Sequence, residues 1–142
     1  MWFDDLSPCT YFPADAKLLA VGWLERGNPY RTGTVDRRVY DALVEMRKNA
    51  WQPFVCAGVH ECDLCSYKPD QCGSANMFIP ADDTIYVCPE LIVHYMNAHE
   101  YAPPDAFCRA VLACPPMRSM QYLKAIKVCG GARLLQPSGG EV

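Results

Sequence analysis

A Cys-x-x-Cys pair followed by two downstream histidines is the feature that most constrains how this chain can fold. Two residues separate Cys62 from Cys65, so both thiolates lie at one turn, spaced as tetrahedral metal coordination requires. His94 and His99 can supply the other two ligands, because histidine pairs at this spacing are typical of zinc sites. The sequence therefore predicts a Zn²⁺ site made of these four side chains.

The histidine spacing leaves the choice of ligands partly open. Positions five apart on a regular α-helix differ by about 140° of rotation, so both histidines reach one ion only if the helix end tightens. Pro103 follows shortly after His99 and is consistent with such an end. His60 is the runner-up ligand or a hydrogen-bonding partner of the site, and Cys88 would replace one histidine in a treble-clef arrangement.

The remaining patterns predict short strands and amphipathic helices. Apolar runs and turn signals predict a strand at residues 17–24, a short apolar run at 54–58 and a hairpin of 75–80 with 84–89. Helices are expected over residues 35–49, capped by Thr34, and over 89–101, 105–113 and 117–128.

These elements make an α+β fold with a small, mostly antiparallel sheet of three or four strands and about four helices. Its middle portion would be organised by metal. The order knuckle, hairpin, helix resembles treble-clef and zinc-finger elements, although 28 residues separate Cys65 from His94, which is longer than in a zinc finger. The predicted helix also places its ligands in the middle and at the end, whereas a treble clef uses the first turn.

Length and composition indicate one domain. The chain has 142 residues, of which 51% are hydrophobic and 20% charged, and this favours a folded chain over a disordered one. We expect a single zinc-binding α+β domain over residues 1–129. Residues 130–142 begin with two glycines and end in PSGGEV, which is typical of a flexible tail.

Charge and cysteine content bear on partners and location. The net charge is −3 and no run of lysine or arginine stands out, so a nucleic-acid partner is disfavoured. The N-terminus lacks the pattern of a secretory signal, and no apolar run is long enough to predict a membrane span. With no signal, nine cysteines that include a metal-binding pair favour reduced thiols and a cytoplasmic location over a disulfide framework.

Several segments resemble an uncharacterised family of small bacterial proteins. The resemblance rests on DLSPCTYF, VGWL, GVHECDLC, GSANMFIP and CPELIVHYMNAHEYAPP, over roughly residues 4–113. Members carry an H-x-C-x-x-C knuckle and a downstream H-Y-x-x-x-H-x-Y-x-P-P segment. The resemblance implies that the family signature includes His60, Cys62, Cys65, His94 and His99, and it implies no activity.

Three kinds of function fit a zinc site in this chain. The first is a structural site in a protein-interaction or regulatory module, with a groove for a protein or peptide lined by Tyr11-Phe12-Pro13, Asn28-Pro29-Tyr30 and Tyr101-Ala102-Pro103-Pro104. The second is a hydrolase-like zinc enzyme with Glu61 or Glu100 as the base. The third is a thiol-based redox or metal sensor. The deaminase signature and H-E-x-x-H are both absent, which favours the structural site over an enzyme.

Overall fold

The computed structural model describes residues 1–12, 16–54, 60–65 and 72–135, without the side chains of His60, Cys72 and Gly73. Within these residues the strands are β1 (Leu18–Ala20), β2 (His60–Glu61), β3 (Cys72–Gly73), β4 (Asn76–Ala81) and β5 (Thr84–Pro89). The α-helices are α1 (Arg37–Lys48), α2 (Ile92–Ala98), α3 (Asp105–Ala113) and α4 (Met120–Ile126). None of the described helices is long and apolar enough to cross a membrane.

The central sheet has three strands in the order β1-β5-β4. Strand β5 pairs with β4 in antiparallel fashion and with β1 in parallel fashion, so the sheet is mixed. A second, two-stranded antiparallel sheet joins β2 to β3. Together with the four helices, this small mixed sheet confirms the predicted α+β class.

The hairpin of β4 and β5 forms as predicted, with Asp82 and Asp83 at its tip. Ala81 is paired with Thr84, which leaves a two-residue turn. Asp82 has a φ of 53°, a left-handed conformation that aspartate tolerates better than most residues.

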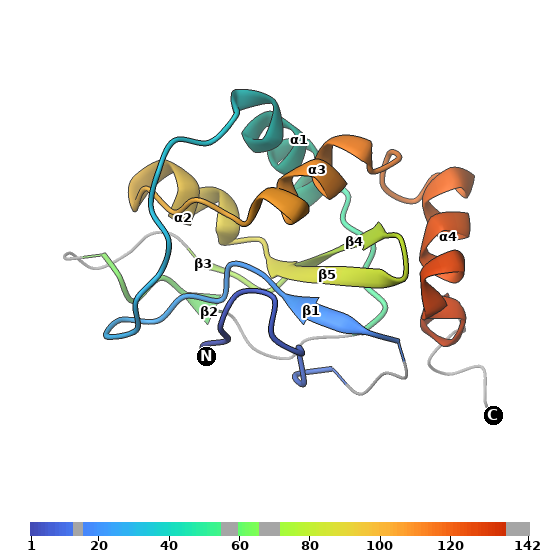
Figure 1. Ribbon diagram of the computed structural model, residues 1–142, viewed down its shortest axis with the longest axis horizontal. Helices are drawn as coiled ribbons and strands as arrows, with labels where there is room; N and C mark the ends of the chain where they lie inside the picture. Colours follow the sequence, from blue (N-terminus) through green and yellow to red (C-terminus); the bar gives the residue numbers. More distant parts are fainter. Residues whose placement is uncertain (13–15, 55–59, 66–71, 136–142) are drawn as a thin grey trace.

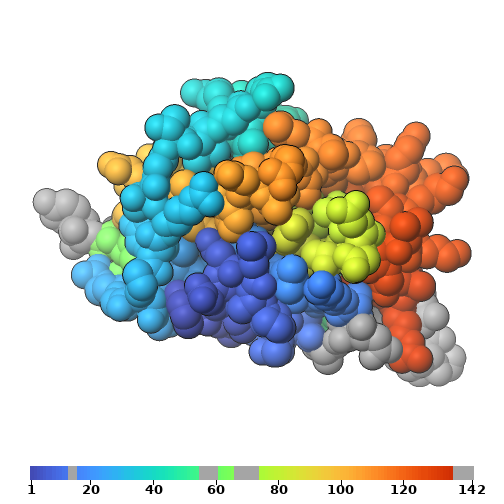
Figure 2. Space-filling model, in the orientation of Figure 1, coloured from blue at the N-terminus to red at the C-terminus, as the bar shows by residue number. Residues whose placement is uncertain are grey.

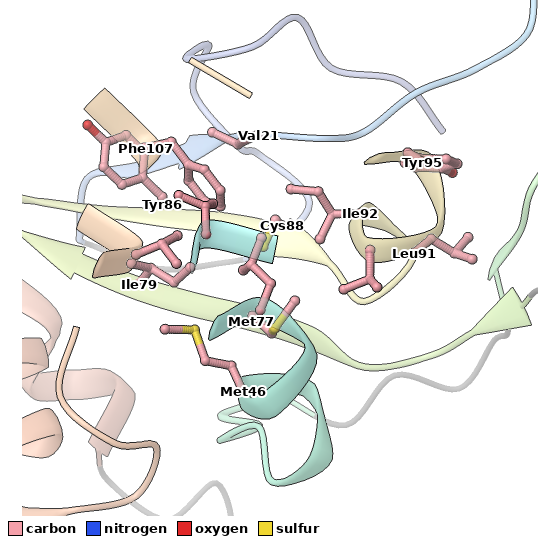
Figure 3. Close-up of a cluster of buried hydrophobic side chains, with 14 of the residues drawn as sticks. Val21, Met46, Met77, Ile79, Tyr86, Cys88, Leu91, Ile92, Tyr95 and Phe107 are labelled. Carbon is pink, nitrogen blue, oxygen red and sulfur yellow. The ribbon is translucent and has the colours of Figure 1, made fainter. Parts of the chain in front are cut away.

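The two faces of the sheet pack into two different apolar cores. Alternate residues of a strand point to opposite faces, so Met77 and Ile79 of β4 join one core while Phe78 between them joins the other. The first core contains buried residues of α1, α2 and α3, which lie together on one side of the sheet in Figure 1. Figure 3 shows part of it, with Met46 of α1 and Ile92 of α2 among side chains of β4 and β5.

The second core joins the other face of the sheet to α4 and to segments on either side of β1. Its buried residues include Phe12, Trp23, Phe78, Tyr122 and Ile126. In Figure 1, α4 stands at the end of the sheet where the hairpin turns. Because Cys129 Sγ donates to the carbonyl of Asp82, the chain that follows α4 is held at the hairpin tip.

Several element boundaries differ from those that the sequence predicts. Helix α1 is capped by Asp36 and not by Thr34, because the Asp36 carboxylate accepts a hydrogen bond from the Arg38 N–H. Pro89 is the last residue of β5, paired with Asn76, and not the first residue of a helix. The 17–24 strand is reduced to Leu18–Ala20, where the parallel pairing to β5 ends.

The C-terminal helix starts at Met120, three residues later than predicted, because Ser119 caps it through the Tyr122 N–H. Beyond it, helical turns cover Lys127–Gly131 and Ala132–Leu135, and Leu134 is buried. These turns include the first residues of the predicted C-terminal tail, and residues 136–142 lie outside the described part of the chain.

Candidate metal centre

The Cys-x-x-Cys turn follows β2 and encloses the first sulfur. The backbone N–H groups of Leu64 and Cys65 donate hydrogen bonds to Cys62 Sγ. The Cys62 side chain is buried against the first core, whereas Cys65 is only half-buried. Since N–H donors stabilise a thiolate, this turn has the geometry of a metal knuckle.

The histidines come from the two ends of α2. His94 is the third residue of the helix, whereas His99 is the C-cap residue, with φ −124° and ψ 15°. Glu100 then adopts a left-handed φ of 57°, and the Tyr95 carbonyl accepts from the N–H groups of both His99 and Tyr101. The helix therefore ends before His99, which frees that ring from the 140° separation that a regular helix would impose.

The knuckle and α2 bring four ligand atoms together. Cys62 Sγ and Cys65 Sγ are 3.7 Å apart, too far for a disulfide. His94 Nε2 lies 3.3 Å from Cys65 Sγ, and His99 Nε2 lies 3.5 Å from Cys65 Sγ and 3.4 Å from Cys62 Sγ. All four atoms lie within 4.8 Å of one another, so the cluster could hold a metal ion.

These separations match the edges of a tetrahedral zinc site. With Zn–S near ~2.3 Å and Zn–N near ~2.05 Å, a regular tetrahedron has S···S edges of about 3.8 Å and S···N edges of about 3.6 Å. The observed distances of 3.7 Å between the sulfurs and 3.3–3.5 Å between sulfur and nitrogen agree with those edges. The spacing is therefore compatible with a tetrahedral metal ion held by all four atoms.

Burial affects the two kinds of ligand differently. Burial lowers the pKa of His94, and the nearby His99 lowers it further, so the His94 ring is held in the neutral form that binds metal. Burial raises the pKa of the Cys62 thiol, a shift that the N–H groups of Leu64 and Cys65 partly oppose. Binding of a metal ion by Cys62 would therefore release a proton.

Side chains from the segment after β1 hold both halves of the cluster. Arg26 donates to the carbonyl oxygens of Asp63 and Cys65, and its own N–H donates to the Asp63 carboxylate. The Tyr30 hydroxyl donates to the carbonyl oxygen of His99. The sequence patterns predict a role for neither residue; the one signal nearby is the turn at Arg26-Gly27-Asn28-Pro29, which marks a strand end without indicating contacts to residues that are far away in the sequence.

A family profile described as a domain of unknown function (DUF7919) matches residues 1–112. The chain belongs to this family. The match confirms that the chain belongs to an uncharacterised family. The matched residues include the four residues of the cluster as well as Arg26 and Tyr30. Comparison with curated proteins and with solved structures yields no match.

The other predicted ligands of the DUF7919 domain are placed differently. His60 belongs to β2, and its side chain lies outside the described residues. Cys88 is buried in β5 within the first core and is not part of the cluster. Since only His94 lies in the first turn of α2, the treble-clef likeness is not confirmed.

The two candidate bases are both exposed. Glu61 lies in β2 opposite Cys72, directly before the first ligand. Glu100 follows His99 in its left-handed conformation. Each is adjacent in sequence to a cluster residue, as expected, and each side chain is exposed to solvent.

A surface cleft of about 440 Å³ lies on the face shown in Figure 2, where the N-terminal residues, the segment near residue 30 and the start of α3 meet. Pro29, Tyr30 and Pro104 line it, together with Trp2 and Phe3. Two of the three predicted groove segments therefore contribute to one cleft. The described residues of the third segment, Tyr11 and Phe12, do not line the cleft, and Phe12 is buried in the second core.

Tyr101 anchors the chain directly after the cluster. Its side chain is fully buried, and its hydroxyl donates to Asp5 Oδ2 at 2.8 Å, while the Gly22 N–H donates to Asp5 Oδ1. Burial raises the pKa of Asp5, and these two donors partly oppose the shift. Tyr101 is therefore one of the two hydrogen-bond donors that the described residues supply to the Asp5 carboxylate.

Tyr101→Phe is expected to lower the free energy of unfolding by about 1–3 kcal/mol near neutral pH, because a half-buried carboxylate loses a donor. The folded-state pKa of Asp5 already lies above its unfolded value, so Asp5 makes the wild type less stable as the pH rises through that interval. Because the substitution removes a donor to the carboxylate, it raises the folded-state pKa of Asp5 further, and the variant loses more free energy of unfolding than the wild type as the pH rises. The difference between variant and wild type in urea unfolding should therefore shrink on acidification.

Tyr40→Phe on α1 is the matched control, since it removes a hydroxyl from a half-buried tyrosine away from Asp5. An unfolding difference for Tyr101→Phe that equals this control, or that grows on acidification, would contradict the assigned role of the Tyr101 hydroxyl.

Proposed function

We propose that this DUF7919 domain binds one Zn²⁺ through Cys62, Cys65, His94 and His99, and that the ion is structural. The observation that carries the proposal is the agreement of four ligand-to-ligand distances with a tetrahedral shell. Two thiolates with two imidazoles form a donor set that suits zinc, and they neutralise its charge. The ion would fasten the knuckle to α2, which the main chain joins only through β3, β4 and β5.

A structural role is favoured over catalysis by the ligand count. A catalytic zinc keeps one position for water or substrate, whereas four protein side chains complete a tetrahedral shell. The exposed Glu61 and Glu100 offer no enclosed base beside the ion. Coordination of water by the bound metal would support the hydrolase-like alternative.

The sensor alternative gains little support from the described cysteines. Burial raises the pKa of the thiols outside the cluster, namely Cys9, Cys88, Cys108, Cys114 and Cys129. Such thiols react slowly with oxidants. Rapid oxidation of one of them in the folded protein would reverse this assessment. The described free thiols also fit the cytoplasmic location that we propose, which cell fractionation tests.

The decisive experiment is a metal count on the purified protein with a cobalt titration. We expect about one zinc per chain, and Co²⁺ in its place should give the intense visible bands of tetrahedral coordination with sulfur-to-metal charge transfer. A protein that folds without stoichiometric metal, or one whose Co²⁺ complex is octahedral, would refute the proposal.

We further propose that the domain serves protein interaction through the cleft bordered by Trp2, Tyr30 and Pro104. The aromatic and proline side chains of the cleft suit an extended peptide. Peptides selected from a random library on the metal-loaded protein should lose binding in Trp2→Ala. Selected peptides that bind this variant normally would point to another surface.

A further inference from the structure

We infer that Arg26 is a positioning residue of the metal centre, which orders the knuckle and strengthens the N–H···S hydrogen bond to Cys62. The inference rests on the proposed zinc site and assigns a function to a residue outside the ligand set. The inference follows from two contacts of one peptide group: Arg26 donates to its carbonyl oxygen, and its N–H donates to the sulfur of Cys62.

Arg26 contacts the knuckle through three hydrogen bonds at once. Its Nε donates to the Asp63 carbonyl at 2.7 Å and its Nη2 donates to the Cys65 carbonyl at 3.0 Å. The Asp63 carboxylate in turn accepts from the Arg26 N–H at 3.0 Å. These contacts span 37 and 39 residues of sequence, so the fork of the guanidinium fixes a turn that belongs to a distant segment.

One of the bonded carbonyls belongs to the peptide group whose N–H donates to Cys62 Sγ. The carbonyl of Asp63 and the N–H of Leu64 form a single trans peptide unit, in which the two groups point in opposite directions. On the outer side the carbonyl accepts from Arg26, and on the inner side the N–H donates to Cys62 Sγ. Arg26, the peptide and the sulfur therefore form a continuous hydrogen-bonded chain.

Such a chain transmits polarisation. A charged donor on the carbonyl draws electron density from the amide, which makes its N–H a stronger donor to the sulfur. The thiolate bound to zinc is thereby stabilised without any direct contact with the guanidinium. Lysine could not reproduce the arrangement, because a single ammonium group lacks the planar fork that reaches two carbonyls.

The test compares Arg26→Ala with Arg31→Ala in the full chain. Arg31 is the matched control, because it is another exposed arginine of the same segment, and it pairs with Asp105 and not with the knuckle. Zn²⁺ affinity is measured by competition with a chromophoric chelator, and the sulfur-to-Co²⁺ charge-transfer band is recorded for each protein. The apparent melting temperature of the metal-loaded proteins checks that both variants fold.

Arg26→Ala should lower Zn²⁺ affinity by about tenfold, at the lower end of the effects of outer contacts because Arg26 is exposed. Its charge-transfer band should shift to lower energy, since a thiolate with a weaker hydrogen bond gives up its electron more readily. Arg26→Lys should fall between the wild type and Arg26→Ala in both readouts, and Arg31→Ala should match the wild type.

An unchanged Zn²⁺ affinity in Arg26→Ala would overturn the assignment. A lower affinity with an unshifted charge-transfer band would also overturn it, because Arg26 would then support the turn without affecting the sulfur. The same titrations separate this inference from the proposed function. If the wild type itself binds neither Zn²⁺ nor Co²⁺, the metal site fails; if the wild type binds both and Arg26→Ala behaves identically, only the role of Arg26 fails.

Discussion

Cys65→Ala is expected to abolish stoichiometric zinc binding and to remove most of the cooperative melting transition. Cys65 Sγ lies 3.3–3.7 Å from each of the three other ligand atoms. Of the four measured distances in the cluster, only that between Cys62 and His99 does not involve this sulfur. Structural zinc contributes an apparent ~10 kcal/mol or more in small domains, which is as large as the whole stability of a typical domain. Calorimetry of zinc-loaded protein, with a metal count on the same samples, measures both effects.

Cys108→Ala is the matched control for this substitution. Cys108 in α3 is also a half-buried thiol, but its sulfur donates to the carbonyl of Pro103, which precedes the helix, and does not contact the cluster. We expect it to retain one zinc and a melting transition close to that of the wild type. If Cys65→Ala melts like Cys108→Ala while the wild type carries zinc, the ion is bound without supporting the fold.

Phe78→Ala is expected to lower the free energy of unfolding by about 3–5 kcal/mol while leaving zinc affinity unchanged. Phe78 is 1% exposed and its ring lies within 5.4 Å of Phe12, 5.7 Å of Trp51 and 6.4 Å of Phe54, centroid to centroid. Removing it leaves a cavity among large rings that cannot close fully. Urea unfolding of the zinc-loaded protein measures the loss.

The unchanged zinc affinity follows from the side of the sheet on which Phe78 lies. It belongs to the second core, whereas Cys62 packs in the first. Met120→Ala, at a residue that is 78% exposed, should change neither stability nor affinity and serves as the control. A Phe78→Ala protein that loses zinc while still folded would show that the two faces are coupled.

Local sequence signals predicted the elements whose structure is set by neighbouring residues. The hairpin depends on a turn between two apolar runs, and α3 extends from Asp105 to Ala113 as predicted because prolines bound it on both sides. The spacing within each pair of predicted ligands is likewise local, whereas the contact between the two pairs is made by the fold.

Long-range pairing accounts for what the sequence did not predict. Nothing local indicates that β1 pairs in parallel with β5, whose partner residues lie 67 positions further along the chain (Leu18 with Ile85). The same pairing network draws Pro89 into β5 through Asn76, although a proline before an apolar run is a common helix start. Arg26 was missed for the same reason, because its partners are brought to it only by the fold.

The end of α2 explains how two histidines five residues apart reach the same cluster. Five-residue spacing favoured a loosened helix end, and the helix does end at Ala98. The left-handed conformation of Glu100 was not predictable, since glycine and asparagine are the usual residues there. The following Tyr101, bonded to Asp5, fixes the chain in that conformation.

The position of the hairpin between the two pairs of ligands has a consequence for how the domain assembles. Strands β4 and β5 lie in the chain between the knuckle and α2, so a bound ion would close a loop of backbone around this local hairpin. Local hairpins form within microseconds, whereas the parallel pairing to β1 must await a much longer loop. Early formation of the hairpin would thus bring the knuckle and α2 close together before the rest of the sheet forms. The rate at which the unfolded chain binds metal would then report on the formation of this hairpin.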